Sequence, residues 1–287
     1  MRHNRSLSLA FFATLASSLL FAASAPARAA LIEVDIGKTF QNQQTESGVA
    51  LFGSFFAARA YMDVVGDFDG GRLAHPGTES PNTLVPGADA GGILVGHQTA
   101  YITPTELNTR YDFGDYAFTA TNSSTLVSQS ATIGYTHDAF TNDTPALTVA
   151  SFQALQGTNA AAPITVSFNT FTPSPDADQS FTYFSIFDHT SNSFVFADNA
   201  APFSTSSEFI AGGTLTAGHA YTYEIIFDNR IIGQDAGTGL LTQQYFDVRT
   251  FGDFTAAAVP EPEVHALLLA GLGLLGLIAK GRQQRRA

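Results

Sequence analysis

Alternating apolar and polar residues constrain this chain to a β fold more strongly than any other feature. In YTYEIIFD, from Tyr221 to Asp228, the aromatic and aliphatic side chains fall on one face and polar ones on the other, except at Ile226. This period of two indicates a half-buried strand. Similar segments occur at 116–121, 164–168 and 194–198, whereas 180–188 is apolar on both faces, as expected of a strand covered on two sides. No comparable helical stripe with caps accompanies them, so we predict an all-β body.

Turn signals divide these strands at intervals that are typical of β-sandwiches. The polar, Pro-terminated sequence NDTP at 142–145 precedes the most regular strands, so we place a boundary there. We predict two domains, a β-rich domain at 30–142 and an immunoglobulin- or fibronectin-like sandwich at 143–258. The Gly- and Pro-rich stretch from 66 to 96 is either part of the first domain's strands or one long surface loop.

A further fold signal lies just before the strand that starts near Tyr221. Leu215, Gly218 and Tyr221 have the Leu-x-x-Gly-x-x-Tyr spacing, which resembles the tyrosine corner of immunoglobulin-like and fibronectin-type sandwiches. The resemblance implies that the Tyr221 hydroxyl bonds to backbone a few residues upstream. Alternatively, Tyr221 is only the first core aromatic of its strand. Both interpretations make the residue structural.

The charge of the body, residues 31–258, limits its partners. Six Lys and Arg stand against 23 Asp and Glu, so the formal net charge is −17. Such a surface repels phosphate backbones, so we expect no nucleic-acid partner. The chain has no cysteine, which excludes disulfides, thiolate chemistry and cysteine zinc sites. We expect no cofactor.

The N-terminal 29 residues have the layout of a secretory signal peptide. Basic residues precede an apolar stretch from Leu7 to Ala23, and small residues stand at Ala27 and Ala29. We predict cleavage after Ala29, at an Ala-x-Ala site. The alternative is a retained membrane anchor, but the apolar run is short and ends before Pro26.

The C-terminus, residues 259–287, has three ordered parts. Val259-Pro260-Glu261-Pro262 comes first, and the prolines hold the preceding residues extended. A 14-residue apolar run follows from Ala266 to Ala279, which is short for a membrane-spanning helix. Basic residues then favour a cytoplasmic end on the far side of a membrane. These residues are Lys280, Arg282, Arg285 and Arg286.

This three-part tail resembles the PEP-CTERM sorting signal. The resemblance implies an exported protein with a short transmembrane helix, processed near Pro-Glu-Pro by an exosortase-like membrane protease. It also implies a producer that makes extracellular polysaccharide and biofilm. A plain single-span anchor is the alternative for the tail. The tail is also catalogued with ice-binding proteins, but the regular ranks of Thr-x-Thr that would support ice binding are absent, and Thr119 and Thr121 stand as an isolated pair. FDVRTFGDFT, from Phe246 to Thr255, resembles the last strand that precedes this tail.

Chemistry-bearing motifs are sparse. His75, His97, His137, His189 and His219 are far apart in sequence, and there is no Gly-x-Ser-x-Gly elbow or P-loop. We therefore predict no catalytic or metal site, although carboxylates paired only in space would allow a glycoside hydrolase. Calcium could bind the turn that contains Asp63, Asp67 and Asp69, but an ordinary Asp-Gly turn explains it as well.

Together these features predict an exported cell-surface or matrix protein, associated with biofilm and structural or adhesive in role. A carbohydrate-binding module is the first alternative, in which Tyr61, Tyr101 or Tyr111 would stack on sugar rings. An exported hydrolase is the second.

Overall fold

The computed structural model describes residues 30–87, 93–95, 103–198 and 200–257, together with residues 270 and 272. Strands dominate these residues, so the all-β prediction is confirmed. The elements are β1 (Leu31–Thr45), β2 (Gly48–Met62), β3 (Gly70–Ala74), β4 (Asn82–Pro86), β5 (Ile93–Val95), α1 (Pro104–Arg110), β6 (Gly114–Asn122), β7 (Val127–Tyr135), α2 (Val149–Leu155), β8 (Ile164–Ser167), β9 (Gln179–Asp188), β10 (Ser193–Ala197), β11 (Ala201–Pro202), β12 (Ser207–Ile210), β13 (Ala220–Gln234) and β14 (Leu241–Thr255).

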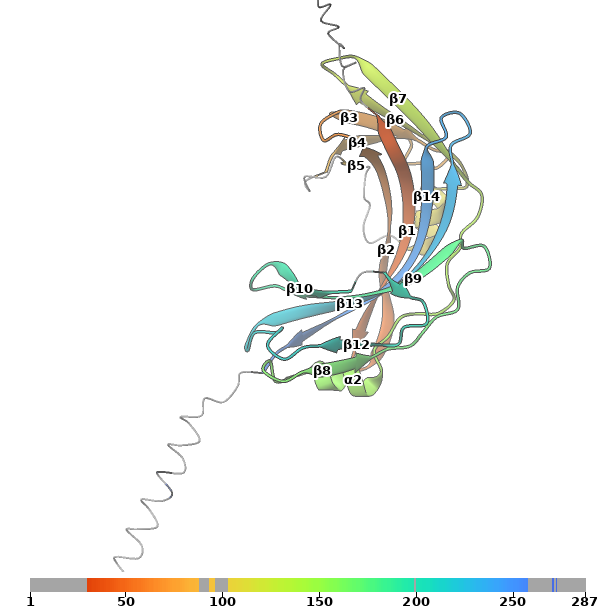
Figure 1. Cartoon of the computed structure of the whole chain (residues 1–287). Helices are drawn as coiled ribbons and strands as arrows, with labels where there is room; N and C mark the ends of the chain where they lie inside the picture. Colours follow the sequence, from red (N-terminus) through yellow and green to blue (C-terminus); the bar gives the residue numbers. More distant parts are fainter. Residues whose placement is uncertain are drawn as a thin grey trace, which may run out of the picture.

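One large sheet organises the fold. It has 12 strands in the order β10-β9-β13-β14-β1-β2-β5-β4-β3-β6-β7, with β11 paired to β9. β8 and β12 form a separate two-stranded sheet. The long strands β1, β2 and β14 run through the middle of the molecule and belong to both of its ends (Figure 1). The sheet is therefore continuous from one end to the other.

The first and last strands of the body are neighbours in this sheet. β1 pairs with β14 in parallel register, from Glu33 opposite Leu241 to Gln43 opposite Phe251. The other pairings between named strands are antiparallel. Because the pair is parallel, the start of β1 and the end of β14 lie at opposite ends of the molecule (Figure 1).

Two hydrophobic cores lie along the sheet. The first is built from buried residues of β1–β7 and α1, with Phe246 of β14. The second is built from residues 147–256, where β9, β13 and β14 face β8, β12 and α2. The predicted boundary at residue 142 falls between the two sets, yet β14 supplies Phe246 to one and Phe254 to the other. The division into two domains stays a prediction.

Gln44 of β1 connects the two ends of the molecule. Its amide nitrogen donates to the Leu147 carbonyl at 2.9 Å, and its amide oxygen accepts from the Leu147 N–H at 2.9 Å. The Tyr223 hydroxyl donates to the same oxygen at 2.8 Å. Since Gln44 is buried, these bonds fix the tip of the β1–β2 hairpin against the second core.

Helices and short strands differ from the sequence-based expectation. Thr103 and Glu106 form a capping box at the start of α1, with Pro104 in its first turn. Each helix has only seven residues, too few for an amphipathic stripe.

Strands β3, β4 and β5 lie in the stretch 66–96, which is therefore not one long loop. β9 is fully buried on one face only, and on its other face Tyr183 lines an open groove.

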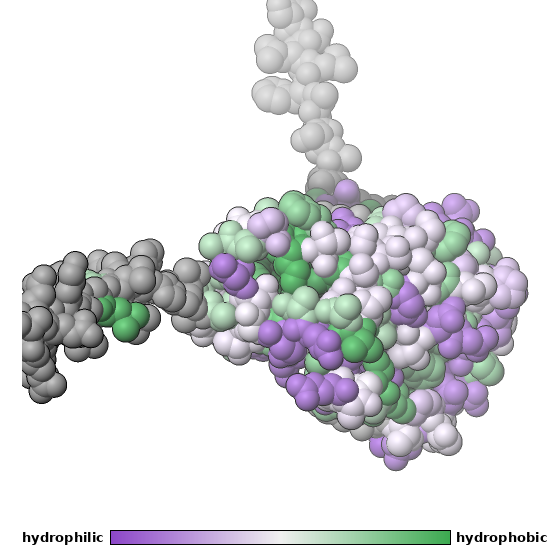
Figure 2. All heavy atoms as spheres, turned by 90° about the horizontal axis from the view of Figure 1, so that it is seen from below, coloured by the Kyte–Doolittle hydropathy of each residue, from purple (hydrophilic) through white to green (hydrophobic). Residues whose placement is uncertain are grey.

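The end of the molecule near β8 and α2 carries apolar side chains between polar ones. Figure 2 shows them as narrow strips among hydrophilic residues. Val149 is 72% exposed and Phe209 is 62% exposed. Single exposed apolar residues of this kind are ordinary on a protein surface.

Candidate functional site

The candidate site lies on the sheet face that turns away from the cores, and a repeated sequence creates it. Phe-Asp-Asn-Arg at 227–230 lies in β13, and Phe-Asp-Val-Arg at 246–249 lies in β14. Because alternate residues of a strand share a face, each Phe enters a core while its Asp and Arg point the other way. Asp228 lies directly opposite Asp247. The two strands thus gather two carboxyl and two guanidinium groups on one surface.

Strands β1 and β2 extend this surface with a third pair. Arg59 lies opposite Asp35, and its Nε donates to both carboxylate oxygens at 3.0 and 3.1 Å. Gly37 lies opposite Tyr245 of β14. A Cβ atom at Gly37 would overlap the Cδ2 and Cε2 atoms of that ring. The glycine therefore lets the tyrosine lie flat across the backbone of β1.

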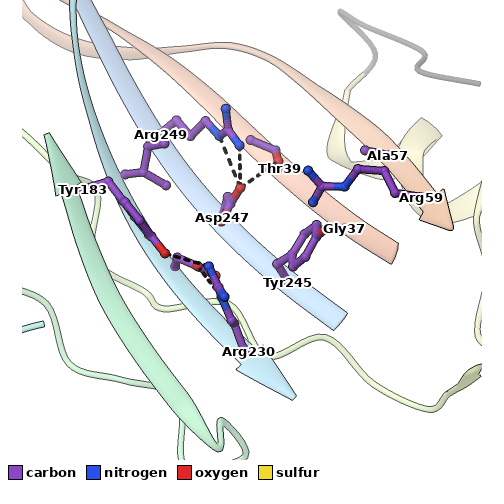
Figure 3. Close-up of a pocket in the computed structure, with 11 residues that line it drawn as sticks. Gly37, Thr39, Ala57, Arg59, Tyr183, Arg230, Tyr245, Asp247 and Arg249 are labelled. Carbon is purple, nitrogen blue, oxygen red and sulfur yellow. Dashed lines mark hydrogen bonds and ion pairs between the residues drawn. The ribbon is translucent and has the colours of Figure 1, made fainter. Parts of the chain in front are cut away.

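The arginine groove is the open hollow that these side chains line (Figure 3). Arg230 Nε donates to Asp228 Oδ2 at 2.7 Å, and its Nη2 donates to the Tyr183 hydroxyl at 2.6 Å. Arg249 Nη2 donates to Asp247 Oδ2 at 2.7 Å. The groove has a volume of about 260 Å³ and is lined by Gly37, Thr39, Ala57, Arg59, Tyr183, Ile226, Asp228, Arg230, Tyr245, Asp247 and Arg249.

Burial changes the acidity of the carboxyl groups in and beside the groove. Loss of solvation, reinforced by the charge of Asp247, raises the pKa of Asp228 to about 7. Loss of solvation also raises the pKa of Asp35 to about 6, although the charge of Arg59 opposes it. A fraction of these groups is therefore protonated near neutral pH and can donate as well as accept hydrogen bonds.

Aromatic rings complete the groove. Within the described part of the chain, the hydroxyl of Tyr245 has no hydrogen-bond partner although it is buried. Such a group is costly unless a water or ligand satisfies it. Guanidinium groups stacked on rings are held in place and keep their remaining N–H groups available. Arg59 lies 4.7 Å from the Tyr245 ring centroid, Arg230 5.1 Å from that of Phe181, and Arg249 5.3 Å from that of Phe55.

This arrangement suits a neutral ligand rich in hydroxyl groups better than an anion. Each arginine already has a carboxylate partner, and Arg249 has a second in Glu224 at 3.7 Å. The groove therefore carries no excess positive charge. Its planar donors and acceptors match the paired hydroxyls of a sugar, and its rings offer apolar faces. Among the described residues, no group of three or more His, Asp or Glu could hold a metal ion.

The groove was not predicted, although the sequence holds a signal for it. Three of the five arginines between residues 31 and 258 line it. The repeated Phe-Asp-x-Arg places an acid and a base two residues apart on strands with a strong alternation. What the sequence does not show is that these strands are neighbours in register.

The residues of the proposed tyrosine corner lie together. The Tyr221 hydroxyl accepts from the Thr216 N–H at 2.6 Å and donates to the Thr216 carbonyl at 3.2 Å. Leu215 is buried in the second core. Gly218 has φ of +80°, which favours glycine, and its N–H donates to the Ala256 carbonyl at 2.9 Å. Tyr221 thereby holds the turn that leads into β13.

The three aspartates of the proposed calcium turn do not converge. Asp69 accepts from the Ser123 N–H at 3.0 Å and from its hydroxyl at 2.5 Å. Asp67 accepts from the Ala30 N–H at 3.3 Å. Asp63 belongs to no metal-binding group among the described residues. The carboxylates thus act in local hydrogen bonding, as expected of an ordinary turn.

The described histidines lie apart. His75 is buried beside Tyr111 and Tyr116 and bonds to Asn82 at 2.9 Å. His219 Nδ1 lies 2.8 Å from Asp188 Oδ2. His189 Nε2 lies 2.7 Å from the Thr222 hydroxyl, and His137 Nε2 lies 3.7 Å from Asp176.

The tyrosines considered for sugar stacking differ in how accessible the structure makes them. Tyr111 is fully buried and stacks on Phe56 at 3.8 Å, so it cannot contact a sugar. Tyr61 is half-buried next to the groove, with Arg59 5.9 Å from its ring centroid. Tyr101 lies outside the described residues, as does His97.

Apart from residues 270 and 272 of the tail, both predicted processing segments also lie outside the described residues. They comprise the signal cleavage residues Ala27 and Ala29 and the tail from residue 259, with its predicted transmembrane helix. No helix among the described residues is long and apolar enough to cross a membrane. The tail residues concerned are Val259, Pro260, Glu261, Pro262, Lys280, Arg282, Arg285 and Arg286.

Comparisons with known proteins support the interpretation of the tail. Residues 258–286 match the PEP-CTERM protein-sorting motif. Among curated proteins, none matches the sequence. Similar solved structures include chicken CNTN1 FN1–FN3 domains (7% identity, TM-score 0.24, 71% of this chain and 63% of that one). Another is the BSP domain of a biofilm-associated protein (11% identity, TM-score 0.20, 71% and 28%). The chain thus spans less than two thirds of either.

Proposed function

We propose that this chain is a structural or adhesive protein of the cell surface or extracellular matrix. The observation that carries the proposal is the PEP-CTERM motif at 258–286, which indicates an exported protein sorted by exosortase, a membrane enzyme. The motif starts one residue after Ala257, whose N–H donates to the Thr158 carbonyl at 2.8 Å. The described part of the body therefore extends to the residue just before the matched motif.

The topology of the sheet supports a load-bearing role. A body held at its C-terminal end and pulled from its other end would be loaded between the start of β1 and the end of β14. These strands are parallel neighbours over residues 33–43 and 241–251. Their hydrogen bonds run across the strands, so such a load shears all of them at once. This geometry favours mechanical resistance.

The sorting proposal is tested by replacing Pro260, Glu261 and Pro262 with alanine in the native producer. We expect the variant to accumulate in the membrane fraction, uncut, while the original chain reaches the surface or matrix. Glu263→Ala is the matched control, since it changes a neighbouring acid outside Pro-Glu-Pro. An unchanged distribution and mass of the triple variant would refute the proposal.

The arginine groove favours a second candidate function, the binding of a neutral glycan. Its paired guanidinium and carboxyl groups, with the unpartnered Tyr245 hydroxyl, offer donors and acceptors for vicinal hydroxyls. In this proposal the body adheres to matrix polysaccharide through the groove. Tyr61, which lies next to the groove, would then be part of the same glycan-binding surface.

Affinity electrophoresis in gels that contain polysaccharide tests this second candidate. The gels hold the producer's own polysaccharide, neutral dextran or acidic polygalacturonate. We expect retardation by a neutral polymer, lost in Arg230→Ala and kept in Arg72→Ala, which changes an arginine outside the groove. If no polymer retards the protein, the proposal of glycan binding is refuted. If polygalacturonate alone retards it, the proposal that the ligand is neutral is refuted. Release of reducing sugar that Asp228→Asn abolishes would instead identify a hydrolase.

A further inference from the structure

Lys38 is a buried amine that the groove does not use. It lies on β1 between Gly37 and Thr39, but its side chain points to the first core and is 2% exposed. Lysine is almost never buried to this extent unless it is paired. The groups that surround its Nζ atom therefore need an explanation.

A carboxamide and a carboxyl group meet this amine. Lys38 Nζ donates to Asn108 Oδ1 of α1 at 2.9 Å, and Asp138 Oδ1 lies 3.5 Å from Nζ. The carbonyl carbon of Asn108 is one bond beyond that oxygen, about 1.2 Å further on. The amine thus lies against the carboxamide of Asn108, with the carboxyl group of Asp138 beside it as a potential proton carrier.

Aromatic rings enclose the three groups. The Nζ atom lies 4.6 Å from the ring centroid of Tyr135 and 5.4 Å from that of Phe113. The Tyr135 hydroxyl donates a hydrogen bond to Asp138. Burial lowers the pKa of Lys38 and raises the pKa of Asp138, and each effect favours the uncharged form. Only an uncharged amine has the lone pair that attacks a carbonyl carbon.

We propose that Lys38 and Asn108 are joined by an intramolecular amide bond, formed after folding with Asp138 as the proton carrier. The Nζ lone pair attacks Cγ of Asn108, and the bond from Cγ to Nδ2 breaks. Asp138 takes one proton from Nζ and delivers it to the departing nitrogen. The products are a secondary amide and one molecule of ammonia, and no oxidant or other reactant is needed.

The surroundings of Asn108 suit this reaction. α1 is a short helix whose only buried residue is Leu107, and Asn108 itself is exposed. Its amide oxygen reaches the buried amine while ammonia has a route to solvent, which makes the step irreversible. The bond would tie α1 to β1 across 70 residues of sequence. A cross-link of this length strongly restricts the unfolded chain.

Peptide mapping of the purified full chain tests the proposal. Trypsin does not cleave after an acylated lysine, so residues up to Arg59 should remain linked to residues 73–110. We expect one branched peptide whose mass is the sum of the two peptides less one ammonia. Cleavage after Lys38, with an unmodified peptide 73–110, would overturn the proposal even without a variant.

Three variants assign the roles. Asn108→Ala, at an exposed position, should abolish the branched peptide and restore cleavage after Lys38. Asp138→Asn should reduce the linked fraction at least tenfold in freshly folded protein. Thr109→Ala is the matched control on the same helix, because its hydroxyl donates only to the Thr105 carbonyl, and it should leave the link intact. A linked peptide that persists in Asn108→Ala would refute Asn108 as the acceptor, and equal linkage in Asp138→Asn would refute its role.

Discussion

Replacing Gly37 with alanine tests how the central strands and the arginine groove depend on each other. The new Cβ atom would overlap Tyr245 Cδ2 and Cε2, and the ring Cγ would be 3.3 Å away. Either the strands separate locally or the ring leaves its position across β1. The second response exposes a side chain that is now 9% exposed and breaks its contact with Arg59.

The loss of unfolding free energy in Gly37→Ala can be estimated in two independent ways. Overpacking in a closed site costs about 1–3 kcal/mol. Displacing half of a tyrosine that buries about 150–250 Å² costs roughly 2–3 kcal/mol at about 25 cal/mol per Å². With a urea m-value of about 2 kcal/mol per M, the unfolding midpoint should fall by roughly 0.5–1.5 M.

Urea unfolding followed by tyrosine fluorescence measures this shift, since the chain has nine Tyr and no Trp. Gly134→Ala is the matched control, because its Cβ would meet nothing nearer than Asp115 Oδ1 at 3.8 Å. We expect the control to change stability by less than about 0.5 kcal/mol. Equal midpoints for the two variants would refute the packing of Tyr245 against Gly37.

Three further predictions concern stability. Tyr221→Phe removes two hydrogen bonds to Thr216 and should cost about 1–3 kcal/mol of unfolding free energy; an unchanged thermal midpoint would show that the bonds contribute nothing. Gln44→Ala leaves Leu147 without its two buried partners and should cost about 2–4 kcal/mol, whereas the exposed neighbour Glu46→Ala should be neutral in the same urea titration. The pKa of Asp228 is about 7 in the folded state and about 3.9 in the unfolded state. Between these two pH values the folded state binds more protons than the unfolded state, so the free energy of unfolding should fall as pH rises from 5 to 8. Asp228→Asn should flatten that slope, and an equal slope in the variant would contradict the assignment.

The strands with strong alternation could be predicted from sequence because their burial repeats their pattern. Residues 221, 223, 225 and 227 are buried along β13 as expected. In β9 the buried face contains Phe184 and Ile186, while Phe181 and Tyr183 are half-buried beside the groove. An apolar face does not reveal whether another layer or an open groove covers it.

Short elements could not be predicted because their stability comes from partners far away in sequence. β3 pairs with β6, some 50 residues later, and its five residues carry too little pattern to identify a strand. The capping box of α1 is a local feature, because Thr103 and Glu106 are only three residues apart in the sequence. The groove depends on the pairing of β1 with β14, about 200 residues later in the chain, which no local signal specifies.

The most direct test of the central claim is the mass and location of the protein in its native cells. If the chain is exported and sorted through its tail, the mature protein will be recovered from the envelope or matrix with termini near Ala30 and close to Pro260. Recovery of the uncut, full-length chain from the cytosol would contradict this account.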